Sequence, residues 1–469
     1  MADGMNTEVT KIGVQKVPRR LLGALLSGIS AGVVPRSGAP YIAIGRTEEI
    51  RALSDDLARV ADGQSSMRFL VGRYGSGKSF LIQLMRARAA ELGFVTADAD
   101  LSPERKLSGE GGLATYRELA RNLAVKACPD GGAFGSILER WFASLTAGIP
   151  DSLSAEEYRA AARREASRVL TPLTEEIGGL DYTAVLMRAL DSYITDDADG
   201  TAAALGWLRG EYRTKTEARA ATGLRAIGVI TDANWYLHLR LLSRFVRLIG
   251  YKGLVVFIDE CVNLYKIVNR VSREANYEKI LSMYNDTLQG ACEGLMIVLG
   301  GTPRFLEDTR RGLFSYEALR SRLTDGRFAS VNPALELKNT MSPVIRLRRL
   351  SDNELFALLV RLTALHAQYY GTPEALTDAQ REIFLKEELS RALADEMITP
   401  REIIRDFVTL LDLMYQNPNV PFENIVAQTV ESAPKGENLS AEVVTDAPAD
   451  VPDAPVTPPP AVSLDDLDF

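Results

Sequence analysis

A short stretch of the sequence, VGRYGSGKSF at residues 71–80, has the spacing of a phosphate-binding loop. In such a loop, backbone N–H groups and the N-terminus of the following helix point at phosphate groups, and glycines permit the tight curve. The apolar run MRFLVG (67–72) precedes the loop, and a helical pattern follows it until Gly93. This context of strand, loop and helix favours the functional interpretation over a chance match. The predicted nucleotide-binding residues are Gly72, Arg73, Tyr74, Gly75, Ser76, Gly77, Lys78 and Ser79.

The elements that follow along the chain indicate a parallel sheet of the α/β class. FVTADAD (94–100) is typical of a second strand, so that strand, loop, helix and strand form a βαβ unit. GLVVFIDE (253–260) and GLMIVLGGTP (294–303) resume the strand pattern. Residues 101–245 carry helical periodicity, which predicts a large helical insertion between strands of one sheet.

Two adjacent acids end the third predicted strand. A magnesium–nucleotide site needs an acid at a strand end, and Asp259 is expected to hold Mg²⁺ together with the hydroxyl of Ser79. Glu260 is expected to polarise the attacking water as a general base, and Lys78 to reach the β and γ phosphates. Two acids after an apolar run often mark only the end of a strand. Their pairing with the phosphate-binding loop favours the functional interpretation.

Four further residues are candidates for sensing or stabilising the γ phosphate. Thr302 follows the fourth predicted strand and would orient the water, although a simple turn explains it as well. Arg320 and Arg322 are candidates for an arginine finger that reaches a neighbouring subunit, and the alternative is a solvated helix face. Arg401 lies in the first turn of a predicted helix, where a cation opposes the helix dipole. A nucleotide phosphate is therefore its expected partner.

The composition, 46% hydrophobic and 25% charged, is that of an ordinary protein with a sizeable core. Residues 1–430 contain 53 acidic and 53 basic residues, whereas residues 431–469 contain nine acidic residues and one basic residue. A neutral body argues against nucleic-acid binding through bulk charge, but it is compatible with a local basic surface. Three separated cysteines and two histidines exclude a disulfide framework and a histidine-rich metal site, and fit a reducing cytoplasm.

The N-terminal stretch RRLLGALLSGISAGVVP (19–35) resembles an export signal, because two arginines precede an apolar run. Serines interrupt the run, however, and 17 residues precede Pro18. An amphipathic helix is therefore the preferred interpretation. No run in the sequence reaches the roughly 18 apolar residues of a membrane-spanning helix, which favours a cytoplasmic protein without membrane contact.

The C-terminal part of the chain changes character twice. After Pro343 the pattern is helical, and from about residue 432 the chain is rich in proline, alanine and aspartate, which is typical of disorder. The last residues, SLDDLDF, interleave apolar and acidic side chains and end in Phe469. They predict docking on a partner or on the protein's own body, and a solubilising linker is the alternative. The predicted parts are an N-terminal helical segment (1–40), an α/β core (41–340) with the helical insertion at about 101–245, a helical domain (341–430) and a disordered tail (431–469).

These residues together resemble the AAA+ superfamily of P-loop NTPases. The shared features are the phosphate-binding loop, the adjacent acids, a polar strand-end sensor, a finger arginine and a helical lid that carries an arginine. AIGRTEEIRAL (43–53) resembles a segment of the origin-recognition and STAND-like branches that normally lies near the adenine. The resemblance implies an α/β core of the P-loop NTPase (AAA+-like) class, a C-terminal helical lid domain, and ATP with Mg²⁺ as ligands.

The chain is also similar to the ATP-binding proteins of bacteriophage-exclusion (BREX) systems, the BrxD-like family. The similarity spans roughly residues 20–410, and DLSPERKLSGEGGLATYREL (100–119) is its most specific segment. The resemblance implies a cytoplasmic ATPase in a multi-gene antiphage defence system. We predict a homo-oligomer that works with other defence proteins and on DNA. Three functions fit: an ATPase that remodels or loads a partner, a nucleotide-gated switch with slow hydrolysis, and a scaffold that binds ATP structurally.

Overall fold

The computed structural model describes residues 17–33, 38–150, 152–325, 339–394 and 399–431. The chain divides into two units, residues 1–418 and residues 419–469. Within the second unit the structure describes a helix, α18 (Phe422–Glu431). Residues 432–469 of the predicted tail, with the predicted docking residue Phe469, lie outside the described residues.

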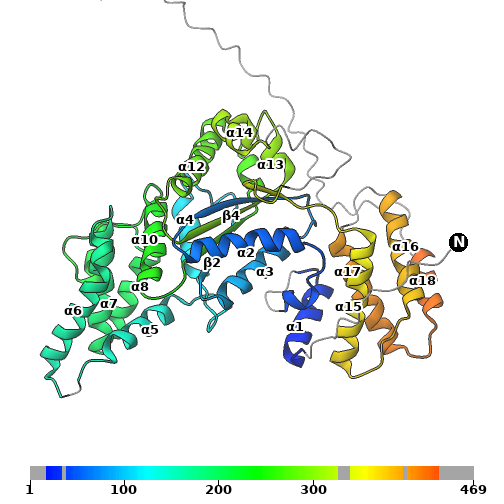
Figure 1. The fold of residues 1–469 in the computed structure, drawn as a ribbon, viewed down its shortest axis with the longest axis horizontal. Helices are drawn as coiled ribbons and strands as arrows, with labels where there is room; N and C mark the ends of the chain where they lie inside the picture. Colours follow the sequence, from blue (N-terminus) through cyan, green and yellow to red (C-terminus); the bar gives the residue numbers. More distant parts are fainter. Residues whose placement is uncertain (1–16, 34–37, 151, 326–338, 395–398, 432–469) are drawn as a thin grey trace, which may run out of the picture. The chain divides into compact units, whose positions relative to one another are not determined.

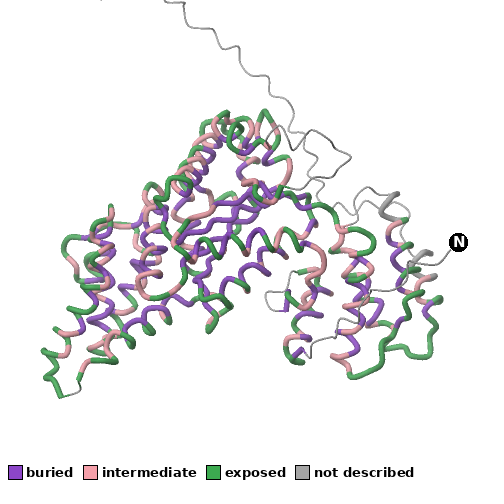
Figure 2. The backbone as a smooth tube through the Cα atoms, in the orientation of Figure 1, coloured by how far each residue is buried: buried purple, intermediate pink, exposed green. Residues whose placement is uncertain are grey.

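A five-stranded sheet forms the centre of the first unit, with the strand order β2-β3-β4-β1-β5. Every pair of neighbours is parallel, which confirms the predicted α/β class with a parallel sheet. The strands are almost wholly buried (Figure 2), because apolar residues point to both faces and helices cover both. The strands are β1 (Ser66–Val71), β2 (Val95–Asp100), β3 (Leu254–Asp259), β4 (Leu295–Gly301) and β5 (Val344–Arg346).

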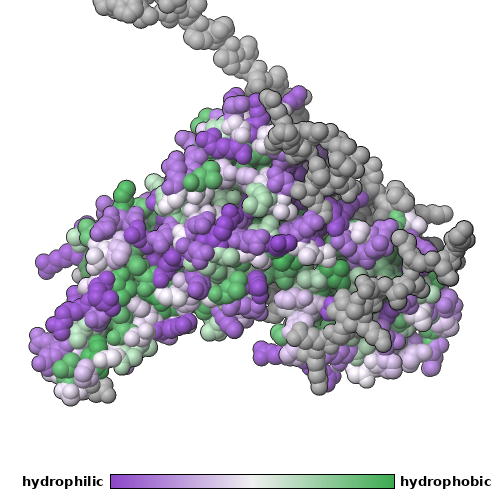
Figure 3. All heavy atoms as spheres, viewed as in Figure 1, coloured by the Kyte–Doolittle hydropathy of each residue, from purple (hydrophilic) through white to green (hydrophobic). Residues whose placement is uncertain are grey.

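Two helices, α2 (Thr47–Ala61) and α3 (Lys78–Glu91), pack on one face of the sheet (Figure 1). The outer surface of α2 forms a hydrophilic band in Figure 3, while its leucines and valine face the strands. The other face carries α4 (Gly112–Arg121), α10 (Trp235–Leu248) and α12 (Arg270–Leu288).

Seven helices lie between β2 and β3, although these two strands are neighbours in the sheet. Their apolar faces join those of the strands in one continuous core, which includes the fully buried Trp207, Trp235 and Tyr182. The helices not yet named are α5 (Phe134–Thr146), α6 (Ala155–Thr174), α7 (Gly179–Ile194), α8 (Ala198–Leu208) and α9 (Lys215–Thr222).

The chain after Pro343 differs from its sequence-based prediction in one respect. A helical pattern was predicted throughout, and this was wrong for residues 344–346, which form β5 and pair with β1. Three residues are too few to show a period of two, so only the pairing with β1 identifies the strand. The core sheet consequently extends to Arg346.

Three long helices follow, α15 (Asp352–Tyr370), α16 (Asp378–Ala394) and α17 (Pro400–Gln416). Capping boxes at Ser351 and Thr399 fix the first turns of α15 and α17. The first helix among the described residues, α1 (Arg19–Ser30), is amphipathic as predicted and packs its leucines against α15 and α17. Among the described residues, no helix combines the length and apolar character needed to span a bilayer.

Candidate functional site

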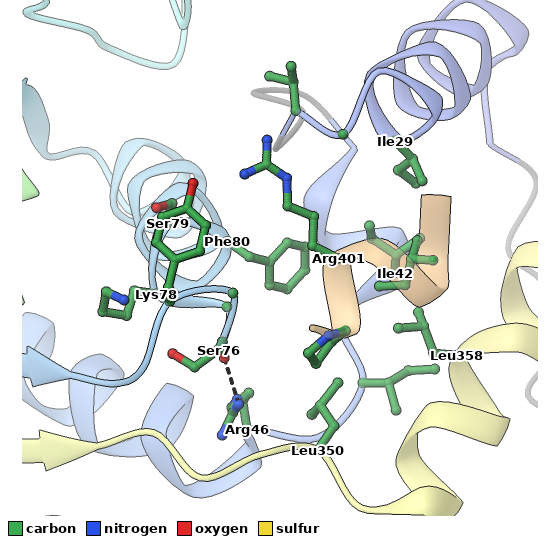
Figure 4. A pocket seen from close by; sticks show the side chains of 18 of the residues that line it. Ile29, Ile42, Arg46, Ser76, Lys78, Ser79, Phe80, Leu350, Leu358 and Arg401 are labelled. Carbon is green, nitrogen blue, oxygen red and sulfur yellow. Dashed lines mark hydrogen bonds between the residues drawn. The ribbon is translucent and has the colours of Figure 1, made fainter. Parts of the chain in front are cut away.

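A pocket opens at the carboxyl end of β1, where the phosphate-binding loop meets four other segments of the chain. Its cavity volume is about 200 Å³. Figure 4 shows Ile42, Leu350 and Leu358 on one side of the pocket and Lys78 and Ser79 on the other. The pocket thus has a polar end at the loop and an apolar chamber beside it. The apolar lining residues are Ile29, Val33, Ile42, Ile44, Phe80, Leu350, Leu358 and Ile404.

The backbone of the loop depends on glycine at two positions. Gly75 and Gly77 have φ angles of +70° and +89°, in the left-handed region that glycine adopts without strain. A Cβ atom at Gly75 would also lie 2.4 Å from the Cβ atom of Thr399, the N-cap residue of α17. The loop and the start of α17 therefore approach each other more closely than any other residue at position 75 would allow.

The ammonium group of Lys78 lies over the loop. Its Nζ atom donates hydrogen bonds to the carbonyl oxygens of Gly72, at 2.9 Å, and Arg73, at 3.1 Å. Burial lowers the pKa of Lys78, while the nearby charges of Asp259 and Glu260 oppose this shift. The lysine is thus a partly desolvated cation held by weak neutral acceptors, which a phosphate oxygen would replace with a stronger partner.

The predicted magnesium ligands Ser79 and Asp259 are in direct contact. Ser79 Oγ donates to Asp259 Oδ2 at 2.7 Å, and the backbone N–H of Glu260 donates to Asp259 Oδ1 at 2.8 Å. The position of Asp259 depends on Gly300 of β4, because a Cβ atom there would lie 2.2 Å from Asp259 Oδ1. A hydroxyl and a carboxylate in contact with each other are oxygen ligands of the kind that Mg²⁺ takes.

We expect the substitution Gly300→Ala to move Asp259 and to destabilise the protein. The added methyl group overlaps Asp259 Oδ1 within a fully buried strand, and such overpacking typically costs about 1–3 kcal/mol. Thermal melts should show a lower midpoint than for Gly135→Ala in α5, where the nearest atom to the added Cβ is an ordinary 3.8 Å away. Equal midpoints for the two variants would show that β4 and Asp259 adjust without cost.

Glu260, the predicted general base, has a backbone φ of +56°. This conformation is uncommon for a residue with a side chain, and it turns the carboxylate out of the strand line. Glu260 lines the pocket. Burial and the adjacent charge of Asp259 raise its pKa, whereas Lys78 and Lys266 act in the opposite direction.

Asp100, a third acid at this edge of the sheet, was not among the predicted site residues. It ends β2 in register with Asp259 of β3. Burial and the charges of Asp259 and Glu260 raise its pKa. The acidic end of FVTADAD was the available signal, but only the adjacency of β2 and β3 brings the three carboxylates together.

Arg46 was also not among the predicted site residues. It supports the phosphate-binding loop from below in the view of Figure 4. Its Nη2 atom donates to the carbonyl oxygens of Ser76, at 2.8 Å, and Arg348, at 2.5 Å. Arg348 in turn forms an ion pair with Glu354 of α15 at 2.6 Å. Arg46 lies in AIGRTEEIRAL, and its resemblance to a nucleotide-proximal segment was the signal for it. One buried guanidinium therefore joins the loop to the start of the C-terminal helices.

A buried polar atom in the loop fits a phosphate ligand. Ser76 Oγ is buried and has no hydrogen-bond partner among the described residues. A buried hydroxyl without a partner is costly, and a bound oxygen atom would satisfy it. With Lys78 and Ser79 in the same loop, the donor set therefore suits a phosphate chain.

Arg401 also lines the pocket, as the second residue of α17. Figure 4 shows its side chain extending beside the phosphate-binding loop. A Cβ atom at Gly32, which follows α1, would lie 3.6 Å from Arg401 Nε. Arg401 is exposed to solvent where it lines the pocket.

The remaining predicted residues do not line this pocket. Thr302 caps α13 (Pro303–Glu307), and its hydroxyl accepts a hydrogen bond from the Phe305 N–H at 3.3 Å. Arg320 and Arg322 lie on α14 (Glu317–Leu323). Arg320 pairs with Glu317 at 2.8 Å, and Arg322 donates to the carbonyl of Ala318 at 2.8 Å. Among the described residues, the hydrogen bond and the ion pair of these two side chains stay within α14.

The sequence matches one protein-family model along most of its length. The match covers residues 17–430 and is described as BREX system ATP-binding protein BrxC/D. A search of curated proteins found no match. The matched range contains the phosphate-binding loop, the adjacent acids and every lining residue of the pocket. The chain therefore belongs to the family of BREX system ATP-binding proteins BrxC/D.

Proposed function

We propose that this protein binds ATP with Mg²⁺ in the pocket beside the phosphate-binding loop and hydrolyses it. The observation that carries the proposal is the hydrogen bond between Ser79 and Asp259, with Lys78 and Glu260 beside it. The loop forms the polar end of the cavity, and an apolar chamber lies next to it. The phosphates would lie on the loop and the base in the chamber. The family supports ATP as the ligand. Hydrolysis and Mg²⁺ are our inference from the side chains.

Each residue would have a separate task in hydrolysis. Lys78 and the loop N–H groups hold the β and γ phosphates, and Ser79 and Asp259 hold the metal. When bound, Mg²⁺ would neutralise charge that develops on the phosphate oxygens. Glu260 accepts the proton of the attacking water, and its raised pKa makes it a better base than an ordinary glutamate. The bond to the γ phosphorus forms as the bond to the β–γ bridging oxygen breaks, which gives ADP and phosphate.

The C-terminal helices would serve as a lid over the nucleotide, as in AAA+ proteins. Arg401 at the start of α17 would contact the γ phosphate as a sensor, and the close approach of Thr399 to Gly75 supports this placement. The Arg46–Arg348 link offers a path by which loop and lid affect each other. We therefore propose an AAA+-like core up to β5, with residues 101–245 as its insertion and α15–α17 as its lid.

At the level of the defence system, we propose a cytoplasmic oligomer that uses ATP to remodel or load a partner on DNA. A nucleotide-gated switch is the second candidate. The hydroxyl of Thr302 favours it, because a hydroxyl that already accepts the hydrogen bond from the Phe305 N–H at a helix cap is a poor sensor for orienting water. Steady-state ATP turnover, with and without duplex DNA, separates the two. Turnover over many cycles that DNA stimulates supports remodelling, whereas slow turnover that only a partner accelerates supports the switch. Native mass spectrometry with and without ATP gives the subunit number.

Loss of Arg322 is expected to abolish turnover while ATP binding to single subunits survives. An arginine supplied by a neighbouring subunit typically contributes about 10³–10⁵ to the rate. Subunits with Arg322→Ala should recover activity when they are mixed with Lys78→Ala subunits, since each then supplies what the other lacks. Arg320→Ala tests the other candidate, and Arg270→Ala, an exposed arginine on α12, is the matched control. Failure to recover activity in verified mixed assemblies would contradict a finger at Arg322.

A further inference from the structure

A second cavity lies among the helices between β2 and β3, and none of its lining residues belongs to the nucleotide pocket. Its volume is about 190 Å³. Three of its lining residues are arginines, and only one is an acid. The lining residues are Arg117, Arg121, Gly132, Arg209 and Glu211.

Helix packing and backbone hydrogen bonds bring the three arginines together. Arg117 and Arg121 are one turn apart on α4 and share a face, and Arg209 directly follows α8. Arg117 Nε donates to the carbonyl of Gly210 at 2.6 Å, which ties α4 to the end of α8. The N–H of Gly132 donates to the Arg121 carbonyl at 2.8 Å. Three segments of the chain therefore build the cavity, and these hydrogen bonds connect them.

The protein itself leaves much of this positive charge uncompensated. Arg121 pairs with Glu118 at 3.3 Å, but its side chain is 74% exposed. The side chain of Arg209 has no hydrogen-bond or ion-pair partner among the described residues, and neither has Nη1 of Arg117. Like charges that converge on one cavity repel each other, and a bound anion would relieve that repulsion. The planar guanidinium favours phosphate, which it can contact through two N–H groups at once.

We propose that this cavity binds a phosphodiester group of a nucleic acid backbone. This inference rests on the DNA part of the proposed function and gives it a location. The cavity opens to solvent through the exposed Arg121, so a polymer backbone can reach it. A Cβ atom at Gly132 would meet nothing within 4 Å, so the space beside this residue is open. Contacts to phosphate alone position a protein on DNA without reading the sequence, so binding here is not sequence-specific.

The test is DNA binding by the double variant Arg121→Glu/Arg209→Glu. The probe is a fluorescent duplex of about 30 base pairs with mixed sequence, titrated between about 50 and 200 mM salt. We expect affinity to fall at least about tenfold, and the slope of log affinity against log salt to fall in magnitude by about 2. The matched control is Arg164→Glu/Arg168→Glu on α6, which changes the net charge by the same amount. Arg168 resembles Arg121 because each pairs with a glutamate three residues earlier in its helix. The control should bind like the wild type.

The single variant Arg209→Ala removes a side chain without a protein partner, so it tests the site even if the double variant does not fold. It should lower the salt slope by about 1. Wild-type affinity in both cavity variants, with DNA binding by the wild type intact, would overturn this site alone. Absence of duplex binding by the wild type, in ATP and without it, would overturn the DNA part of the proposed function as well, and ATP binding would stand. If the cavity variants bind duplex DNA like the wild type but no longer bind sodium pyrophosphate, the cavity binds small phosphates. That result would also overturn the proposal.

Discussion

Replacement of Lys78 by alanine is expected to abolish ATP binding. The lysine is the side-chain cation of the loop that lines the pocket, and its Nζ atom donates hydrogen bonds to two carbonyl oxygens. Two charge-assisted contacts to phosphate contribute about 3–6 kcal/mol, which corresponds to roughly 10²–10⁴ in affinity. Titration with a fluorescent ATP analogue measures the loss.

Lys215→Ala is the control for this experiment, because Lys215 is exposed on α9 and lines no described pocket. It should bind the analogue with wild-type affinity. Undiminished binding by the Lys78→Ala protein, with its fold verified by circular dichroism, would end the interpretation of residues 72–79 as a phosphate-binding loop.

The substitution Glu260→Gln is expected to leave ATP bound and to stop its hydrolysis. The amide preserves the shape of the side chain but cannot accept the proton of water, and loss of a general base typically costs about 10²–10⁴ in rate. Glu278→Gln on the exposed side of α12 is the control and should turn over normally. Wild-type turnover in Glu260→Gln would mean that the base lies elsewhere, and Asp100 would be the next candidate.

The pH dependence of turnover gives a second readout of the same residue. A base works only when it is ionised, so the rate should fall as the pH falls through its pKa. Burial and Asp259 raise the pKa of Glu260 above the ordinary value of 4.5. The acid limb of the kcat/KM profile, which reports the free enzyme, should therefore begin at a higher pH than for an exposed glutamate, and it should be absent from the residual activity of Glu260→Gln.

The strands and the loop could be predicted because their signals are local. β1, β3 and β4 are mainly apolar runs that end near a glycine or an acid, and β2 alternates apolar and polar residues. The loop consists of eight consecutive residues. β5 could not be predicted, since three residues carry no period and the strand exists through its pairing with β1. Capping boxes at Ser351 and Thr399 were predictable for the same local reason.

The parts of the site that escaped prediction arise from contacts between distant segments. Asp100 meets Asp259 through strand register, and Arg46 meets Ser76 and Arg348 across 30 and 302 positions of sequence. The arginine cavity likewise unites α4 with the end of α8. A single sequence shows each residue type but not these adjacencies. Arg320 and Arg322 stay predictions, because their proposed partner lies on another subunit.

The location of the bound nucleotide is the central claim, and photolabelling with 8-azido-ATP and Mg²⁺ tests it most directly. The account predicts that the azido base labels the apolar chamber, so that modified peptides contain residues 29–46 or 350–358 and excess ATP prevents the labelling. Labelling should vanish in Lys78→Ala. Modification confined to the helices between β2 and β3, or labelling that ATP does not displace, would contradict the assignment of the pocket.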